Sequence, residues 1–111
     1  MYASVRHYSV VAERVDEFMH RVDEKFAPQL EQMPGFVAYQ AIAAGVDRAG
    51  EGRVFTVTIC SDREAADRSA EIASEFVRDE LGDMEVERLE AATGAVSVNR
   101  AVSEVLETAH A

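Results

Sequence analysis

The chain has 111 residues, of which 48% are hydrophobic and 29% are charged, and its formal net charge at pH 7 is −10. These proportions are typical of one folded domain with a hydrophobic core, and they exclude a disordered chain. The ten arginines and the single lysine are scattered along the sequence, so we expect neither nucleic acid nor a membrane as a partner.

The first half of the sequence predicts a strand, a long helix and a second strand. Residues 2–9 alternate β-branched or aromatic residues with polar ones, as strands do. Apolar residues of segment 11–26 recur at helical spacing. Pro28 is expected to kink this helix or to begin a separate last turn. The proline–glycine pair that follows ends the helix before a second strand at residues 36–44.

The next part predicts a hairpin and a second helix. A turn rich in glycine and aspartate over residues 45–52 connects the second strand to a third strand at 53–60. Ser61 and Glu64 match the S-x-x-E capping box. They indicate a helix over about residues 62–81.

The C-terminal part is less regular. Gly82 stands where a glycine cap of the second helix is expected. The pattern over residues 84–92 is ambiguous, and residues 93–98 are interpreted as the last strand, with a bulge at Gly94. Residues 100–111 form a tail or a short terminal helix.

The expected order of elements is βαββαβ, the ferredoxin-like α+β arrangement, over residues 1–99. It predicts a four-stranded antiparallel sheet with two helices on one face. The third strand carries Phe55, Val57 and Ile59 on one face and further apolar residues on the other. On the second strand, simple alternation groups Phe36, Ala38 and Ile42. Both faces of the sheet are too apolar for water, so we expect a homodimer that packs sheet against sheet.

Three segments carry a resemblance to a known family: residues 2–8 (YASVRHY), 33–39 (MPGFVAY) and 57–66 (VTICSDREAA). The chain resembles the dimeric α/β-barrel superfamily, and within it the small proteins grouped with antibiotic-biosynthesis monooxygenases. The resemblance implies a homodimer and cofactor-independent oxygenation of a small aromatic or phenolic substrate. The quinone-forming and haem-degrading members rely on a tryptophan, which this chain lacks. Their catalytic residues therefore do not carry over.

His7 is the candidate catalytic residue. It alternates with Ala3 and Val5, so it is predicted to face an interior, where a neutral imidazole acts as a general base near pH 7. The alternative is a hydrogen-bonded histidine in the core or at the dimer interface. A ligand is expected between the sheet and the helices, near His7, Tyr39 and Thr58, which are polar groups on otherwise apolar strands.

Arg6 and Tyr8 fall on the other face of the first strand. With Tyr39 they form a candidate anchor for a phenolic or carboxylate ligand, and dimer-interface packing is the alternative. They become the pocket residues if His7 points into the dimer interface. Cys60 is interpreted as a small buried hydrophobic residue rather than a reactive thiol. The histidines and the cysteine lack metal-site spacing, so neither a metal nor a cofactor is expected.

Three functions remain open at this point. The first is a monooxygenase-like enzyme acting on a small aromatic or phenolic substrate. The second is a non-catalytic ligand-binding module, and the third is a structural dimer domain. A polar-anchored cavity of ligand size between sheet and helices favours the first two, and collapsed packing favours the third. The N-terminal residues lack the pattern of a signal peptide, so the expected location is cytoplasmic.

Overall fold

A computed structural model describes residues 1–102 of the chain. The elements occur in the expected order, with the first helix divided into segments. The strands and helices are β1 (Tyr2–Val11), α1 (Val15–Arg21), α2 (Ala27–Glu31), β2 (Phe36–Val46), β3 (Glu51–Cys60), α3 (Arg63–Glu80) and β4 (Glu87–Ala95). Residues 100–102 have no regular secondary structure, and the rest of the expected terminal helix lies outside the described residues.

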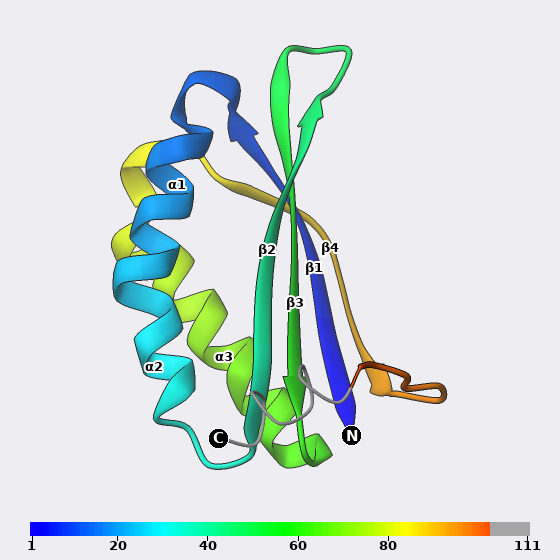
Figure 1. The fold of residues 1–111 in the computed structure, drawn as a ribbon. Helices are drawn as coiled ribbons and strands as arrows, with labels where there is room; N and C mark the ends of the chain where they lie inside the picture. Colours follow the sequence, from blue (N-terminus) through cyan, green and yellow to red (C-terminus); the bar gives the residue numbers. More distant parts are fainter. Residues whose placement is uncertain (103–111) are drawn as a thin grey trace.

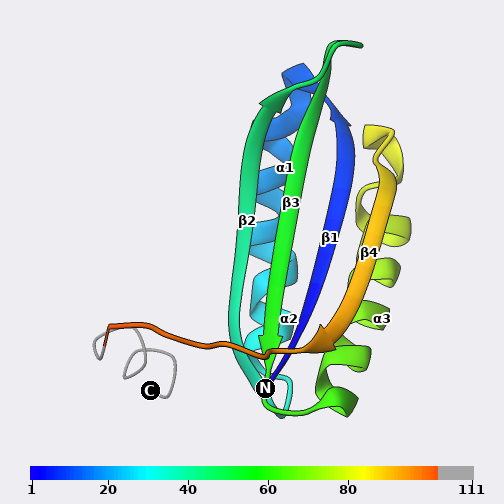
Figure 2. The same ribbon diagram turned by 90° about the vertical axis from the view of Figure 1, so that its right-hand side faces the viewer.

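The molecule has two layers. All four strands form one antiparallel sheet in the order β2-β3-β1-β4. The helices α1, α2 and α3 cover one face of this sheet (Figure 1). Figure 2 looks onto the opposite face, over which no helix of the described chain lies. The predicted ferredoxin-like fold is confirmed. Among the described residues, no helix is both long and apolar enough to cross a membrane.

Strand alternation decides which side chains face the helices. On the covered face, the register pairs buried residues of β1 and β3, namely Ser4 with Thr58, Arg6 with Thr56 and Tyr8 with Val54. The intervening residues lie on the opposite, open face of the sheet. Its residues include Val5 and His7 on β1, Ala38, Gln40 and Ile42 on β2, Phe55, Val57 and Ile59 on β3, and Glu90 and Ala92 on β4.

The first helix is interrupted before Pro28, as the proline predicted. Between α1 and α2 the chain makes a π-helical turn, Val22–Phe26, in which the N–H of Ala27 donates to the carbonyl of Val22. Pro28 then occupies the first turn of α2, where its missing N–H breaks no helical hydrogen bond. The π turn leaves both Val22 and Phe26 buried against the sheet.

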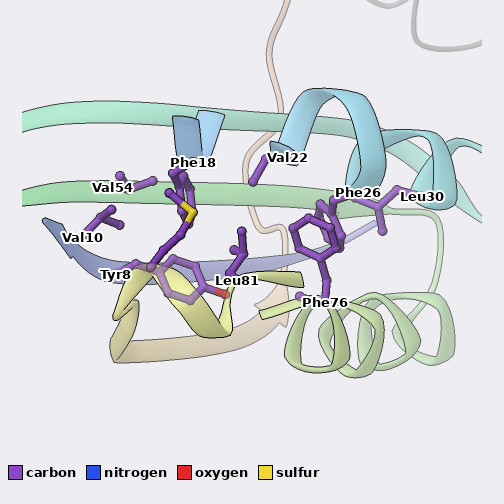
Figure 3. Close-up of a cluster of buried hydrophobic side chains, with 11 residues drawn as sticks. Tyr8, Val10, Phe18, Val22, Phe26, Leu30, Val54, Phe76 and Leu81 are labelled. Carbon is purple, nitrogen blue, oxygen red and sulfur yellow. The ribbon is translucent and has the colours of Figure 1, made fainter. Parts of the chain in front are cut away.

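The hydrophobic core lies between the covered face and the helices. The large, fully buried side chains include Phe18, Leu30, Leu81 and Met84. The ring of Phe26 approaches that of Phe76 on α3, with centroids 5.3 Å apart (Figure 3). This aromatic pair joins the two helical segments above the sheet.

The start of β2 differs from simple alternation. Phe36 pairs with Cys60 and Ala38 with Ile59, so the register shifts between them. Phe36 therefore packs against the core. The prediction that it shares a face with Ala38 and Ile42 is wrong. Gly35 precedes this shift with a φ of +86°, and a Cβ there would lie 2.7 Å from the Cβ of Ala65. Only glycine fits this turn without strain.

The cap of α3 lies one residue later than the S-x-x-E pattern indicates. Asp62 is the N-cap, and its Oδ1 accepts a hydrogen bond of 2.8 Å from the N–H of Ala65. The expected glycine cap at the other end is wrong. The chain continues from α3 into a 3₁₀ turn, Gly82–Met84, and the left-handed residue is Glu85 with a φ of 53°.

The last strand begins well before residue 93. β4 pairs with β1 over Glu87–Ala95, and its bulge lies at Leu89, between the partners of Tyr8 and His7. Gly94 sits in regular register opposite Ala3, so the bulge predicted there is wrong. The true bulge breaks the alternation of side chains at its own position, which explains why this segment was ambiguous in sequence.

Candidate functional site

A cavity lies between the covered face of the sheet and the helices. Its floor is polar and consists of Ser4, Arg6, Tyr8, Tyr39, Thr56 and Thr58. Its roof is mainly apolar and aromatic, and includes Phe18, Val22, Phe26 and Phe76. An apolar wall with a few convergent polar groups is the usual composition of a small-molecule site.

The cavity is narrow. Its atom-free space, counted together with its opening to solvent, is about 380 Å³. The part of this space that a water molecule can enter holds about one or two waters. The packing here is collapsed, which by size alone favours a structural domain, and a ring-sized ligand requires the aromatic roof to move away from the sheet. Phe26 also meets Tyr39 of the floor edge to face, with centroids 5.3 Å apart, so this contact closes the space between roof and floor.

Arg6 is the one charged group of the cavity floor. Its side chain crosses from β1 to α3, where Nη1 donates to the carbonyl of Ala70 over 3.3 Å and Nη2 to the Oγ of Ser74 over 3.0 Å. The residue is 5% exposed, and its buried Nε has no hydrogen-bond partner. Among residues 1–102, no carboxylate forms an ion pair with this guanidinium. A buried charge without a counterion is costly and is rare in proteins.

Two tyrosines of the floor have perturbed pKa values. Burial raises the pKa of Tyr8, an effect that the positive charges of Arg6 and Arg88 partly oppose. Burial also raises the pKa of Tyr39, further than that of Tyr8. Both phenols therefore keep their protons at neutral pH and act as hydrogen-bond donors or acceptors.

Four of the five predicted site residues come together. Arg6, Tyr8, Tyr39 and Thr58 all line the cavity, and register places Tyr39 directly beside Thr58. His7 does not join them. Because Arg6 and Tyr8 face the helices, strand alternation turns His7 to the open face of the sheet.

On the open face, His7 belongs to a small stacked cluster. Its ring lies parallel to that of Phe55, with centroids 4.2 Å apart. The Nε of Arg53 donates to the Nε2 of His7 over 3.4 Å, and the same guanidinium lies 5.5 Å from the Phe55 ring centre. These contacts hold the His7 ring on the open face, and the sheet lies between this ring and the cavity.

The remaining sequence candidates are not part of the site. Cys60 is fully buried, and burial raises the pKa of its thiol, which makes it unreactive. Among residues 1–102, no three histidine, cysteine or acidic side chains gather closely enough to hold a metal ion. The polar contributors that sequence reasoning missed include Ser4, Thr56, Ser74 and, beside Tyr8, Arg88. Thr56 could have been found, since it shares a face with Thr58, whereas Arg88 lies in the segment whose strand pattern the bulge obscures.

Comparison with solved structures places this architecture among known proteins. HapK from Hahella chejuensis superimposes with a TM-score of 0.67 and 19% sequence identity, covering 93% of this chain and 100% of that one. A dimeric ferredoxin-like protein from an uncultured marine organism gives a TM-score of 0.68 at 14% identity, over 91% and 99% of the two chains. The chain has the fold of the dimeric ferredoxin-like proteins.

The same fold occurs in a monooxygenase of Streptomyces coelicolor, solved in complex with the ligand nanaomycin D. Its TM-score is 0.64 at 14% identity, over 92% of each chain. At these identities the likeness concerns the fold alone. No protein-family model and no curated protein matches the sequence.

Proposed function

We propose that this protein binds a small, flat organic molecule in the cavity between its sheet and its helices. The observation that carries the proposal is the contrast between a polar floor with a buried, unpaired guanidinium and an aromatic roof. A core built only for stability is better served by apolar groups on both sides. The floor would orient a ligand by hydrogen bonds, and the roof would pack on its rings.

The chemistry of the lining favours binding over catalysis. Its ionisable groups are the guanidinium of Arg6 and the phenols of Tyr8 and Tyr39. Burial raises both phenol pKa values, so neither tyrosine acts as a base near neutral pH. His7, the candidate base, faces away from the cavity.

A second candidate function is oxygenation of an aromatic or phenolic substrate without a cofactor. The likeness to the monooxygenase solved with nanaomycin D supports it, because that ligand is bound by the same fold. In such a reaction the substrate itself would supply the electrons that reduce oxygen. Oxygen consumption in the presence of an anthrone, absent from a heat-inactivated control, would support this function over simple binding.

The protein is also proposed to form a homodimer through the open face of the sheet. Solved proteins of this fold are described as dimeric. Val5 and Ile42 are large apolar side chains exposed on this side of the sheet. Residues 96–102 leave β4 and run across one end of the same face (Figure 2), where Val98 and Val102 are exposed. A second copy would cover these apolar groups.

A cavity-filling substitution tests the binding proposal. Ala73 on α3 lines the cavity, and Ala44 is exposed near the end of β2. We expect 2-naphthol and 2-naphthoate to bind the wild-type protein, and Ala73→Leu to reduce their affinity at least about tenfold, because the added methyl groups fill the ligand space. Ala44→Leu serves as the matched control. Equal affinity for all three proteins would place the probes elsewhere, and failure of both probes to bind the wild type would contradict the proposal.

A further inference from the structure

At the edge of the cavity, between α3 and β4, lies a feature that we call the mouth. A second depression, lined by Arg6, Tyr8, Ser74, Val77 and Arg88, opens there to solvent. Arg6 and Tyr8 line both this depression and the inner cavity, so the two are adjacent. A ligand that entered between α3 and β4 would meet these two side chains first.

The mouth carries two guanidiniums. Tyr8 neighbours both, because Arg6 precedes it on the same face of β1 and Arg88 is its cross-strand partner on β4. Arg88 is exposed, whereas Arg6 is buried. Among residues 1–102, neither of the two forms an ion pair. In a chain with a net charge of −10, this is a local concentration of uncompensated positive charge.

The donor capacity of Arg6 is also incompletely used. The carbonyl of Ala70 and the hydroxyl of Ser74 fix its two terminal nitrogens on α3, and Nε remains buried without an acceptor. Neither acceptor carries a charge, so neither compensates the guanidinium electrostatically. The arginine is thus held in place by neutral groups while its charge has no partner. An anion entering by the mouth would supply that partner, and charge-assisted hydrogen bonds of this kind are among the strong ones.

We infer that the ligand of this protein is an organic carboxylate, whose apolar body enters the cavity while its carboxylate stays at the mouth, between Arg6 and Arg88. The inference rests on the proposed binding function and names its ligand class. A carboxylate fits because it is ionised throughout the neutral range, whereas a phenol with an ordinary pKa is neutral there and leaves the guanidinium uncompensated. The planar fork of an arginine also matches the geometry of a carboxylate. Tyr8, which keeps its proton at neutral pH, is placed to donate to the same group.

The two arginines would act differently. Arg6 is desolvated, so its interaction with a carboxylate is strong and only weakly screened by salt. Arg88 is exposed, so its contribution is smaller and falls as ionic strength rises. Arg48 in the β2–β3 hairpin turn is exposed far from the mouth and provides a matched control for the loss of one positive charge.

The experiment compares 2-naphthoate with 2-naphthamide, which have nearly the same shape and differ in charge. We expect the wild type to bind naphthoate at least about tenfold more tightly than naphthamide, with a preference that declines at high salt. Arg88→Gln should weaken naphthoate binding about threefold and leave naphthamide binding unchanged. The control Arg48→Gln should leave the binding of both probes unchanged. Arg6→Gln should abolish the preference. Because that variant removes two contacts to α3, the Arg88 variant and the wild-type comparison remain decisive if it does not fold.

The possible outcomes distinguish a failure of the carboxylate inference from a failure of the proposed binding function. Equal affinity for naphthoate and naphthamide in the wild type, with both lost in Ala73→Leu, would overturn the carboxylate inference and leave the binding function intact. An identical loss of naphthoate binding in Arg88→Gln and Arg48→Gln would also overturn it, because the effect would then be one of net charge. Binding of neither probe would count against the binding function itself.

Discussion

Arg6 and Ser74 are 68 positions apart in the chain, yet Nη2 of Arg6 donates to the Oγ of Ser74 over 3.0 Å. This bond ties the strand β1 to the helix α3 at the mouth of the cavity. It holds a positively charged group at the boundary between solvent and the aromatic interior, where a ligand would first meet the protein. The fold thus uses a polar contact at a position where aliphatic packing would serve stability better.

The core between sheet and helices should respond strongly to truncation. Val54 is 0% exposed and Val98 is 78% exposed. We expect Val54→Ala to lower the free energy of unfolding by about 1.5–3 kcal/mol, because it removes buried methyl groups and leaves a void. Val98→Ala should change it by less than about 0.5 kcal/mol. Urea denaturation measures both, and similar losses in the two variants would contradict the described burial.

Two substitutions separate the observed helix cap from the one indicated by the sequence. Asp62→Ala removes the carboxylate that accepts from the N–H of Ala65, and we expect it to lower the free energy of unfolding by about 1 kcal/mol. Ser61→Ala should have a much smaller effect. If the serine variant were the more destabilised of the two, the capping-box interpretation would be the correct one.

Acid should weaken an ion-pair cluster that joins the end of α3 to α1. Nη1 of Arg21 lies 2.7 Å from Oδ1 of Asp83. The hydrogen bond from Arg21 lowers the pKa of this carboxyl from 3.8 to about 2. Because the pKa of Asp83 is lower in the folded state, its ion pair with Arg21 stabilises the fold fully above about pH 4. This stabilisation is lost as the pH falls through 2.

Thermal unfolding of wild type and Asp83→Asn between pH 6 and pH 1.5 measures this effect. We expect the variant to melt at a lower temperature than the wild type at pH 6, and the difference to shrink below pH 4 and to be nearly lost at pH 1.5. Asp16→Asn, at an exposed position of α1, is the control. A difference that stays constant over this range would show that the carboxylate charge of Asp83 is not involved.

Substitutions on the open face should affect assembly and leave ligand binding unchanged. Val57 lies on the central strand β3, paired with Val5 and Gln40. We expect Val57→Glu to convert a dimer into a monomer in light scattering at micromolar concentration, because a second copy cannot bury the new charge. His7→Ala should weaken the dimer while naphthoate affinity stays the same. A monomeric wild type, or loss of ligand binding in the histidine variant, would contradict this division of the two faces.

The fold could be predicted from sequence because its signals are local. The helical spacing of apolar residues, the breaker Pro28 and the alternation on β3 each act within one element. The two misplaced helix caps, at Ser61 and Gly82, were local errors, whereas the errors in the sheet occurred where two strands interact. The shift after Phe36 and the bulge at Leu89 depend on pairing with a neighbouring strand, and no residue type at either position announces them.

The candidate site was predicted in part for the same reason. Arg6 and Tyr8 share a strand face by alternation, and Tyr39 and Thr58 lie on adjacent paired strands. The face that the helices would cover could not be read from β1, because both of its faces carry polar and apolar residues. This is why His7 was grouped with the cavity, although it lies on the opposite side of the sheet.

Backbone amide NMR during a titration with 2-naphthoate shows whether a ligand enters between the sheet and the helices. We expect the largest shift changes at the cavity floor and roof, around Arg6, Tyr39 and Phe76, and small changes at Phe55 and Ile42 on the open face. Changes concentrated on the open face, with the cavity residues unmoved, would contradict this expectation.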